Sequence, residues 1–347
     1  MPREARRHES LESRLDLYAY TRMTDINNHL ETYKAARPRL FSLAYRMTGS
    51  YSDSEDILQD AYLKFARVPA EKIQSAAALL TTIVTRLCLD LLRSSRRKRE
   101  IYIGPWLPEP VPDLYLAHEE AADKETISIA FLTVLQRLAP VERAVFILRE
   151  VFDFDYPEIA GITGKSADYC RQIFHRAKKN LRQTTRPPPL PQNKERELLA
   201  AFLSACNSPN MDDLLRLLKE DMLYVSDGGG IVPAARIPLH RARQVAKFIF
   251  AVRDKVRATK YYVAYINAAP AVVGYEGDQI NFIQIIEPAK GRVQGLFTVL
   301  NPEKLEHFAN RRQLIEKGIL TPISRFFSPA QILRFFWQGL WRRRARA

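Results

Sequence analysis

Cysteine is scarce in this sequence, with three residues (Cys88, Cys170 and Cys206) among 347. None has a second cysteine or a histidine at the spacing of a zinc ligand set or a redox pair. Neither a structural metal site nor a disulfide framework is therefore expected, and we expect no metal and no cofactor. Such cysteine usage suits a reducing compartment, which favours the cytoplasm.

Long apolar runs are also missing. No stretch of about 18 uncharged apolar residues occurs, so a transmembrane helix is not expected. The first residues lack the apolar core of a secretion signal, which again favours a cytoplasmic protein. Met23 opens a plausible domain, so a start of translation at Met1 or at Met23 is compatible with the sequence.

Acidic residues are fewer than basic ones. The chain has 39 Asp and Glu against 53 Lys and Arg, a formal net charge of +14. An excess of this size favours a polyanionic partner such as DNA, a polymerase–DNA surface or anionic lipid. Charge alone is equally compatible with a basic protein that has no such partner.

Proline-rich stretches and apolar patterning divide the chain into segments. We expect an N-terminal extension (1–28), a helical region (29–100), a Pro/Trp-containing linker (101–114), a second helical region (115–186), a Pro-rich linker (187–192), an α+β domain (193–310) and a basic, aromatic tail (311–347). Strand-like runs such as "KYYVAYINA" and "QINFIQIIEP", clustered after two helices, predict the α+β domain. The tail's Ser328 and Pro329 start an amphipathic helix that either packs on its own domain or binds lipid or polymerase.

The second helical region has the pattern of a helix-turn-helix. Helices are expected at residues 156–161 and 166–182, on either side of a glycine turn. Their small shared core would be Ile159, Ala160, Ile162, Ile173 and Ala177. The polar and cationic face of the longer helix would suit a major groove, although any two antiparallel helices with a basic surface would look similar.

The motifs, taken in order, resemble one family. "SDSEDILQDAYLKFA" with "LLTTIVTRLCLDLLRSSRRKRE" resembles region 2 of the extracytoplasmic-function (ECF) sigma factors of bacterial RNA polymerase, and "YPEIAGITGKSADYCRQIFHRAKKNL" resembles their region 4. "YIGPWLPEPV", "DGGG" and "NPEKL" resemble the subgroup with a C-terminal SnoaL-like (nuclear transport factor 2-like) extension. The resemblance implies an all-α region 2, an all-α helix-turn-helix region 4 and a cone-shaped α+β domain.

The resemblance also implies partners and site residues. An acidic helix face would bind core RNA polymerase, whose β′ and β subunits are the expected partners, through Asp53, Glu55, Asp56, Gln59 and Asp60. Acids four apart, such as Asp56 and Asp60, repel each other, and a cationic partner would relieve this repulsion. A helix face that is merely solvated is the alternative.

Promoter DNA would be read by two helices. The resemblance implies −10 contacts from Thr85, Arg86, Arg93, Arg96, Arg97 and Arg99. It implies −35 contacts from Ser166, Tyr169, Arg171, Gln172, His175, Arg176 and Lys179. Leu79 stands where relatives often carry tryptophan, so contacts to the DNA backbone transfer more safely than base stacking.

Catalysis by the α+β domain is not expected, although some SnoaL-like relatives are enzymes. It would need positioned acid–base groups, for which the candidates are Asp227, His240, Glu276, Asp278 and Glu287. Turn positions explain Asp227, Glu276 and Asp278 as well as a catalytic role does. The resemblance implies instead that the extension modulates the sigma core in cis, and a small ligand in its pocket is a further hypothesis.

The linker "IYIGPWLPEPVPDL" lies between the two promoter-reading regions. Its prolines stiffen it, and Trp106 and Leu107 give it an apolar handle. We predict that the α+β domain grips it, through the set Trp106, Leu107, Pro108, Asp227, Gly228, Gly229, Gly230, Asn301, Pro302 and Leu305. A stiff linker with no partner is the alternative.

An alternative sigma factor that directs promoter-specific initiation is therefore the leading hypothesis. A stand-alone helix-turn-helix regulator with a ligand-sensing SnoaL-like domain, and a SnoaL-type enzyme, are the other two.

Overall fold

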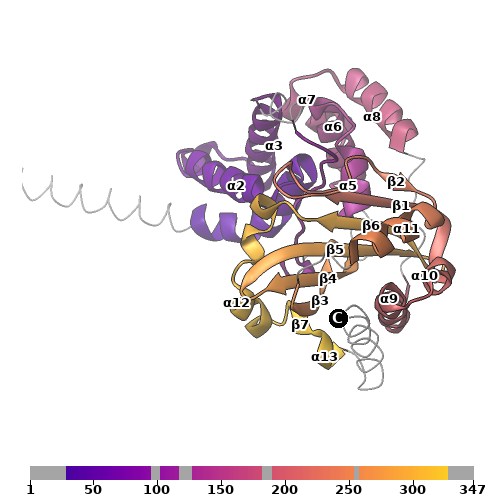
Figure 1. Cartoon of the computed structure of the whole chain (residues 1–347). Helices are drawn as coiled ribbons and strands as arrows, with labels where there is room; N and C mark the ends of the chain where they lie inside the picture. The colour runs from indigo at the N-terminus through magenta and orange to yellow at the C-terminus, as the bar shows by residue number, and fades with distance from the viewer. Residues whose placement is uncertain (1–28, 95–101, 117–126, 182–189, 254–257, 327–347) are drawn as a thin grey trace, which may run out of the picture.

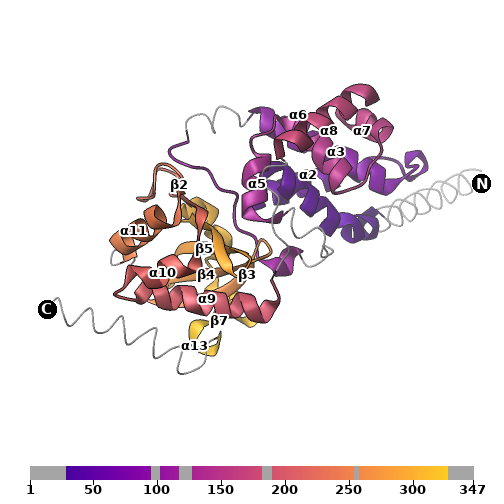
Figure 2. The ribbon, with the colours of Figure 1, turned by 90° about the vertical axis from the view of Figure 1, so that its right-hand side faces the viewer.

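The computed structural model describes residues 29–94, 102–116, 127–181, 190–253 and 258–326. Figures 1 and 2 show a helical part beside an α+β part, with the linker running between them. The expected extension at 1–28 and the amphipathic segment from residue 328 lie outside the described residues. Within the described residues, no helix has both the length and the apolar character needed to span a membrane.

The first helical region consists of a helix at residues 29–48, α2 (Tyr51–Phe65), η1 (Ala70–Lys72) and α3 (Ala76–Ser94). Gly49 follows the first helix with a φ of +70°, the left-handed conformation that glycine adopts without strain. Ser50 caps α2, because its hydroxyl accepts the amide hydrogen of Asp53 at 3.0 Å. Ile57 and Phe65 face the core, as the apolar spacing predicts.

The second helical region consists of α5 (Ile129–Leu135), α6 (Pro140–Glu150), α7 (Tyr156–Thr163) and α8 (Ala167–Leu181). Asp155 and Glu158 form a capping box at the start of α7, and Gly164 ends it with a φ of +69°. The buried side chains between α7 and α8 include Ile159, Ile162, Ile173 and Ala177. The predicted helix-turn-helix is therefore confirmed.

One hydrophobic core joins these two helical regions. Side chains of α2 and α3 pack in the same cluster as those of α6, α7 and α8. Arg143 of α6 is 2% exposed, and its guanidinium donates to the carbonyl oxygen of Met47 at 2.5 Å. It also donates to the carbonyl oxygens of Gln136 at 3.2 Å and Leu138 at 3.3 Å. The sequence analysis predicted two separate helical regions, so it did not predict this shared core.

The α+β domain follows as predicted. It contains α9 (Gln192–Asn207), α10 (Met211–Leu217), β1 (Leu218–Asp227), β2 (Leu239–His240), α11 (Ala242–Val252), β3 (Lys260–Ile266), β4 (Ala269–Glu276), β5 (Gln279–Ala289) and β6 (Arg292–Val299). With β7 (Thr321–Pro322), the sheet order is β2-β1-β6-β5-β4-β3-β7, and its strand pairs are antiparallel except β1–β6, which is parallel.

The two faces of the sheet have different cover. Successive strand residues alternate between two cores, as Tyr224 and Val225 do. On one face the sheet packs against α9, α10 and α11. On the other it packs against Leu107 of the linker, Ile129 of α5 and the short helices η6 (Pro302–Lys304) and η7 (Glu306–Phe308). The second face therefore joins the α+β domain to the helical part.

The α+β domain continues beyond residue 310, where the sequence predicted a tail. Residues 311–326 form α12 (Arg311–Glu316), β7 (Thr321–Pro322) and α13 (Ile323–Phe326). β7 pairs with β3, and Leu314 and Leu320 are buried. The tail prediction was wrong for these residues, because a two-residue strand is too short to show an alternating pattern.

Candidate functional site

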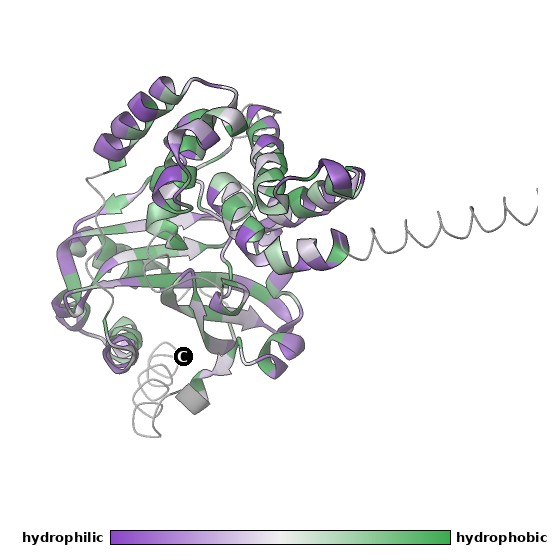
Figure 3. Ribbon diagram, turned by 180° about the vertical axis from the view of Figure 1, so that it is seen from behind, coloured by the Kyte–Doolittle hydropathy of each residue, from purple (hydrophilic) through white to green (hydrophobic). Residues whose placement is uncertain are grey.

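The seven side chains predicted to meet the −35 element are all exposed, on α8 or just before it. Figure 3 shows α8, at its upper left, as largely hydrophilic. Ser166 accepts the amide hydrogen of Tyr169 at 3.2 Å and so caps the helix. Arg171 pairs with Asp168 at 3.2 Å, and Arg176 binds Glu142 of α6. Exposed pairs of this kind are weak, so phosphates can replace them.

The acidic face of α2 is narrower than its sequence suggests. Asp56, Gln59 and Asp60 are exposed, whereas Asp53 and Glu55 are partly buried. The carboxylate of Glu55 also pairs with Arg37 at 2.5 Å. The three exposed residues are thus the part of this face that a partner can reach directly.

The residues predicted to meet the −10 element behave differently. Thr85 is fully buried, because it lies on the same stripe of α3 as Val84 and Cys88, so a DNA contact by its side chain is wrong for this arrangement. Arg86 donates to the carbonyl oxygens of Gly161 at 3.1 Å and Ile162 at 3.3 Å, at the end of α7. Arg93 is exposed, and Arg96, Arg97 and Arg99 lie outside the described residues.

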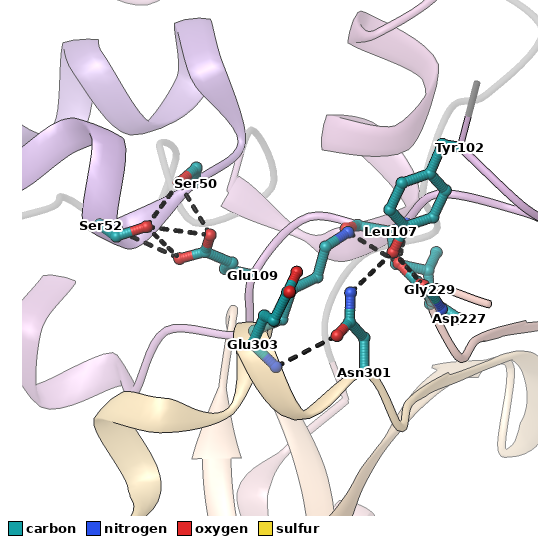
Figure 4. Close-up of polar contacts among 10 residues, drawn as sticks. Ser50, Ser52, Tyr102, Leu107, Glu109, Asp227, Gly229, Asn301 and Glu303 are labelled. Atoms are coloured by element: carbon teal, nitrogen blue, oxygen red, sulfur yellow. Dashed lines mark hydrogen bonds and ion pairs between the residues drawn. The ribbon is translucent and has the colours of Figure 1, made fainter. Parts of the chain in front are cut away.

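Asp227, at the end of β1, is fully buried and binds the linker (Figure 4). Its Oδ1 accepts the hydroxyl hydrogen of Tyr102 at 2.5 Å and the amide of Gly229 at 3.0 Å. Its Oδ2 accepts the amide of Leu107 at 2.8 Å and the ammonium of Lys304 at 2.7 Å. One carboxylate therefore joins two linker residues to two parts of the sheet domain.

Lys304, on η6, completes this network. It is 6% exposed, and besides Asp227 its ammonium binds the carbonyl oxygen of Leu107. The Trp106 ring centroid lies 4.1 Å from the same nitrogen, close enough for a cation–π contact. The predicted set includes Pro302 and Leu305, on either side of Lys304, but not Lys304 itself. Its position inside the "NPEKL" motif was the signal that could have identified it.

The remaining predicted residues surround this network. Gly229 and Gly230 have φ angles of +62° and +75°, and a Cβ on Gly229 would lie 2.4 Å from the Asn301 amide nitrogen. That nitrogen donates to the Tyr102 hydroxyl at 3.0 Å. A Cβ on Gly228 would lie 2.2 Å from a backbone carbonyl oxygen, so glycine is required there as well. Pro108 and Leu305 are buried nearby, and Pro302 starts η6.

Glu109, on the opposite side of the linker, binds the start of α2. Its carboxylate accepts the Ser50 hydroxyl at 2.8 Å and the backbone amides of Tyr51 at 2.8 Å and Ser52 at 3.1 Å (Figure 4). A carboxylate at a helix N-terminus is stabilised by the helix dipole and the free amides. The linker is thus bound on both sides, by the sheet domain and by the first helical region.

Asn267, in the turn between β3 and β4, binds three segments and was missed in the sequence. It is fully buried, and its side-chain oxygen accepts the amide of Val111 in the linker at 2.9 Å. Its side-chain nitrogen donates to the Tyr45 hydroxyl and to the Ile127 carbonyl oxygen, each at 2.8 Å. One side chain therefore joins the sheet domain to the first helical region, the linker and the start of the second.

Glu287, one of the catalytic candidates, binds the start of α5. It is 6% exposed on β5, and its carboxylate accepts the amide of Ala130 in the first turn of α5 at 3.1 Å. The other acid–base candidates, His240, Glu276 and Asp278, are exposed. Within the described residues, the Glu287 carboxylate therefore connects the sheet domain to the N-terminus of α5.

His307, on η7, is a buried titratable residue in contact with the linker. Its Nε2 donates to the Pro110 carbonyl oxygen at 2.5 Å, its ring centroid lies 4.7 Å from that of Tyr51, and burial lowers its pKa to about 4. The unfolded chain binds a proton below its own pKa of about 6.5, whereas the folded chain resists protonation. Stability is therefore expected to fall as the pH drops from 6.5 towards 4, by about 2 kcal/mol at pH 5.

Urea denaturation at pH 7.5 and pH 5 measures this loss. His307→Phe keeps an aromatic ring against Tyr51 but cannot titrate, so its loss should be smaller than that of the wild type by about this amount. His240→Phe at an exposed position is the control. Equal losses for wild type and His307→Phe would contradict the prediction.

A cavity of about 200 Å³ opens at the edge of the sheet, lined by Tyr261, Tyr262, Pro322 and Ile323 among others. Between the sheet and α9, Phe202 is fully buried and fills the space. A small ligand stays a prediction.

Comparison with known proteins gives consistent matches. The Sigma-70 region 2 family matches residues 32–98, and the Sigma-70, region 4 family matches residues 128–181. The ECF RNA polymerase sigma factor SigJ of Mycobacterium tuberculosis is 32% identical over 289 residues, 78% of this chain and 91% of that protein. The probable ECF sigma factor SigI of the same species is 33% identical over 54% of this chain and 65% of its own length. The crystal structure of SigJ is similar with a TM-score of 0.65 and 28% identity, over 80% of this chain and 98% of that one.

Proposed function

Because the chain belongs to the ECF sigma factors of bacterial RNA polymerase, we propose that its SnoaL-like domain modulates sigma activity in cis by holding the linker between regions 2 and 4. As an alternative sigma factor it binds core polymerase and promoter DNA. The observation that carries the proposal is the buried Asp227–Lys304 pair closed around Tyr102 and Leu107.

The proposal is supported by the cost of opening this contact. Release of the linker would break the hydrogen bonds of the Tyr102 hydroxyl, the Leu107 amide and the Leu107 carbonyl oxygen to this charged pair, and hydrogen bonds to charged groups are among the stronger ones. A polar, water-accessible contact would not hold the linker in this way. We infer that the linker leaves the sheet domain in one cooperative step. While it is bound, it fixes the separation of the two promoter-reading surfaces.

The packing of regions 2 and 4 supports a resting arrangement. Thr85 is buried, and Arg86 of α3 is bound to α7 carbonyl oxygens instead of being free for phosphates. Promoter DNA presents its −10 and −35 elements at separate places along the duplex. We infer that the shared core opens when polymerase and promoter bind, and that this takes place in the cytoplasm, where transcription occurs.

The docking of α2 on the β′ subunit is the finer part of this proposal. Asp56→Lys combined with Asp60→Lys is expected to weaken core binding at least about tenfold, because both carboxylates are exposed and the proposal places them in the contact with core polymerase. Glu31→Lys combined with Glu71→Lys changes the net charge equally at exposed sites elsewhere in region 2 and is the control. The measurement is a binding titration of labelled protein with purified core polymerase.

Run-off transcription on a library of genomic fragments tests the function itself. Core polymerase with this protein should give discrete transcripts, and the Asp56/Asp60 variant should lose them. A stand-alone helix-turn-helix regulator would instead bind duplex DNA without core and ignore that charge reversal. Transcripts that do not depend on Asp56 and Asp60 would contradict the docking proposal.

A further inference from the structure

Residues 228–253 contain no Asp or Glu but include Arg236, Arg241, Arg243, Lys247 and Arg253. The first four are exposed, and we call them the α11 basic face. α11 buries its Ala242, Val245, Ala246 and Ile249 against the domain, so its cations stay on the solvent side. None of the polymerase or DNA contacts expected for regions 2 and 4 involves these four residues.

The charges of the α11 basic face have no counter-charge among the described residues. None of its four side chains forms an ion pair there, whereas Arg171, Arg176 and Lys178 of α8 each bind a carboxylate. On the neighbouring elements, Asp213 of α10 pairs with Arg216 and Asp221 of β1 with Lys219, whereas the exposed Asp212 of α10 and Glu220 of β1 form no ion pair among the described residues. The face therefore presents its positive charge to solvent, as a surface for a polyanion does.

Arg241 stands where the backbone disfavours it. It caps α11 with φ +71° and ψ 136°, a conformation that side chains with a Cβ rarely adopt. Its backbone amide donates to the Met222 carbonyl oxygen at 3.1 Å, which fixes the conformation, while its side chain is exposed. Glycine would fit this backbone without strain, so an arginine here indicates a use for the side chain.

The loop between β1 and the α11 basic face contacts the start of the described linker. A Cβ at Gly230 would lie 3.0 Å from Ile103, so the loop leading from β1 towards α11 touches the start of the described linker. Figure 2 shows the β2 region beside that part of the linker, with α11 on its far side. The loop that leads to the α11 basic face therefore lies against the linker that joins the two regions expected to contact promoter DNA.

We propose that the α11 basic face binds the phosphate backbone of promoter DNA. The proposal rests on the sigma function, which brings duplex DNA to this chain. Three of the four cations are arginines, whose planar fork binds phosphate oxygens in pairs. The contact is independent of sequence and adds to those of regions 2 and 4, so the SnoaL-like domain binds DNA as well as the linker.

Arg241→Gly and Lys290→Gly form a matched pair of variants. Both residues are exposed cations with positive φ, and Lys290 lies in the β5–β6 turn, outside the α11 basic face. Both changes should raise the thermal midpoint, because glycine relieves the backbone. Only Arg241→Gly should weaken binding of the full chain to a random duplex of about 30 base pairs, several-fold, and lower the slope of log K against log salt by about 1. Adding Arg236→Gln, Arg243→Gln and Lys247→Gln should lower the slope by about 3 more, to about 4 in total.

Equal salt slopes for Arg241→Gly and Lys290→Gly would overturn the proposal. So would a fourfold variant that keeps its DNA slope but loses binding to phosphatidylglycerol vesicles, which would assign the face to lipid. Run-off transcription with wild-type protein separates the two conclusions. Transcripts together with unchanged slopes would reject the α11 basic face and leave the sigma function standing, and the absence of transcripts would reject the sigma function alone.

Discussion

Asp227→Ala is expected to destabilise the folded chain by about 3–5 kcal/mol, because it leaves the buried ammonium of Lys304 without its carboxylate. The hydroxyl of Tyr102 and the amide of Leu107 lose their acceptor at the same time. The linker should then become accessible to protease between residues 102 and 116. Urea denaturation measures the stability change, and limited proteolysis with mass spectrometry locates the cleavage.

A double-mutant cycle separates the ion pair from general damage. Asp227→Ala with Lys304→Met removes both charges, so it should be more stable than Asp227→Ala alone, with a coupling of about 2–3 kcal/mol. Asp90→Ala breaks the exposed pair with Arg93 and should cost at most about 1 kcal/mol. A loss below 1 kcal/mol in Asp227→Ala, with a protected linker, would show that the sheet domain does not hold the linker.

The same variant has a consequence for transcription. If the network fixes the separation of the two promoter-reading surfaces, its release should relax the dependence on promoter spacer length. Run-off assays on templates whose spacers differ by single base pairs test this. Wild type should prefer one length, and Asp227→Ala should accept a broader range with lower maximal yield.

Local chemistry explains what the sequence could predict. The glycine after α7, the capping acids and the apolar spacing of α2 and α8 act within a few residues, so the helices and their buried faces follow from them. The same holds for the seven exposed side chains on and just before α8. A turn position was also one explanation of Asp227, because aspartate side chains accept nearby backbone amides in turns. The bond from the Gly229 amide to the Asp227 carboxylate fits that interpretation.

Long-range partners explain what the sequence could not. Asn267 has the appearance of an ordinary turn asparagine, because a two-residue hairpin turn favours that residue whatever surrounds it. Its bonds to Tyr45, Val111 and Ile127 join residues more than a hundred positions away. Thr85 is a different case, because it lies on the buried stripe of α3 with Val84 and Cys88, and this helical spacing is visible in the sequence.

Asn267→Gly should separate the sheet domain from the helical part. Glycine tolerates the φ of +53° at this position, so the change removes the side chain without straining the turn. The buried amide of Val111 loses its acceptor, and the carbonyl oxygen of Ile127 loses its donor, which together cost about 2–4 kcal/mol. Ala268→Gly is the matched control, because its φ is +58° and glycine should stabilise it by about 0.5–1 kcal/mol. Hydrogen exchange measures the effect at the amide of Val111. This amide should exchange faster in Asn267→Gly than in the wild type, and its exchange rate should be unchanged in Ala268→Gly. Equal protection of that amide in both variants would mean that the turn backbone, and not the Asn267 side chain, holds the three segments together.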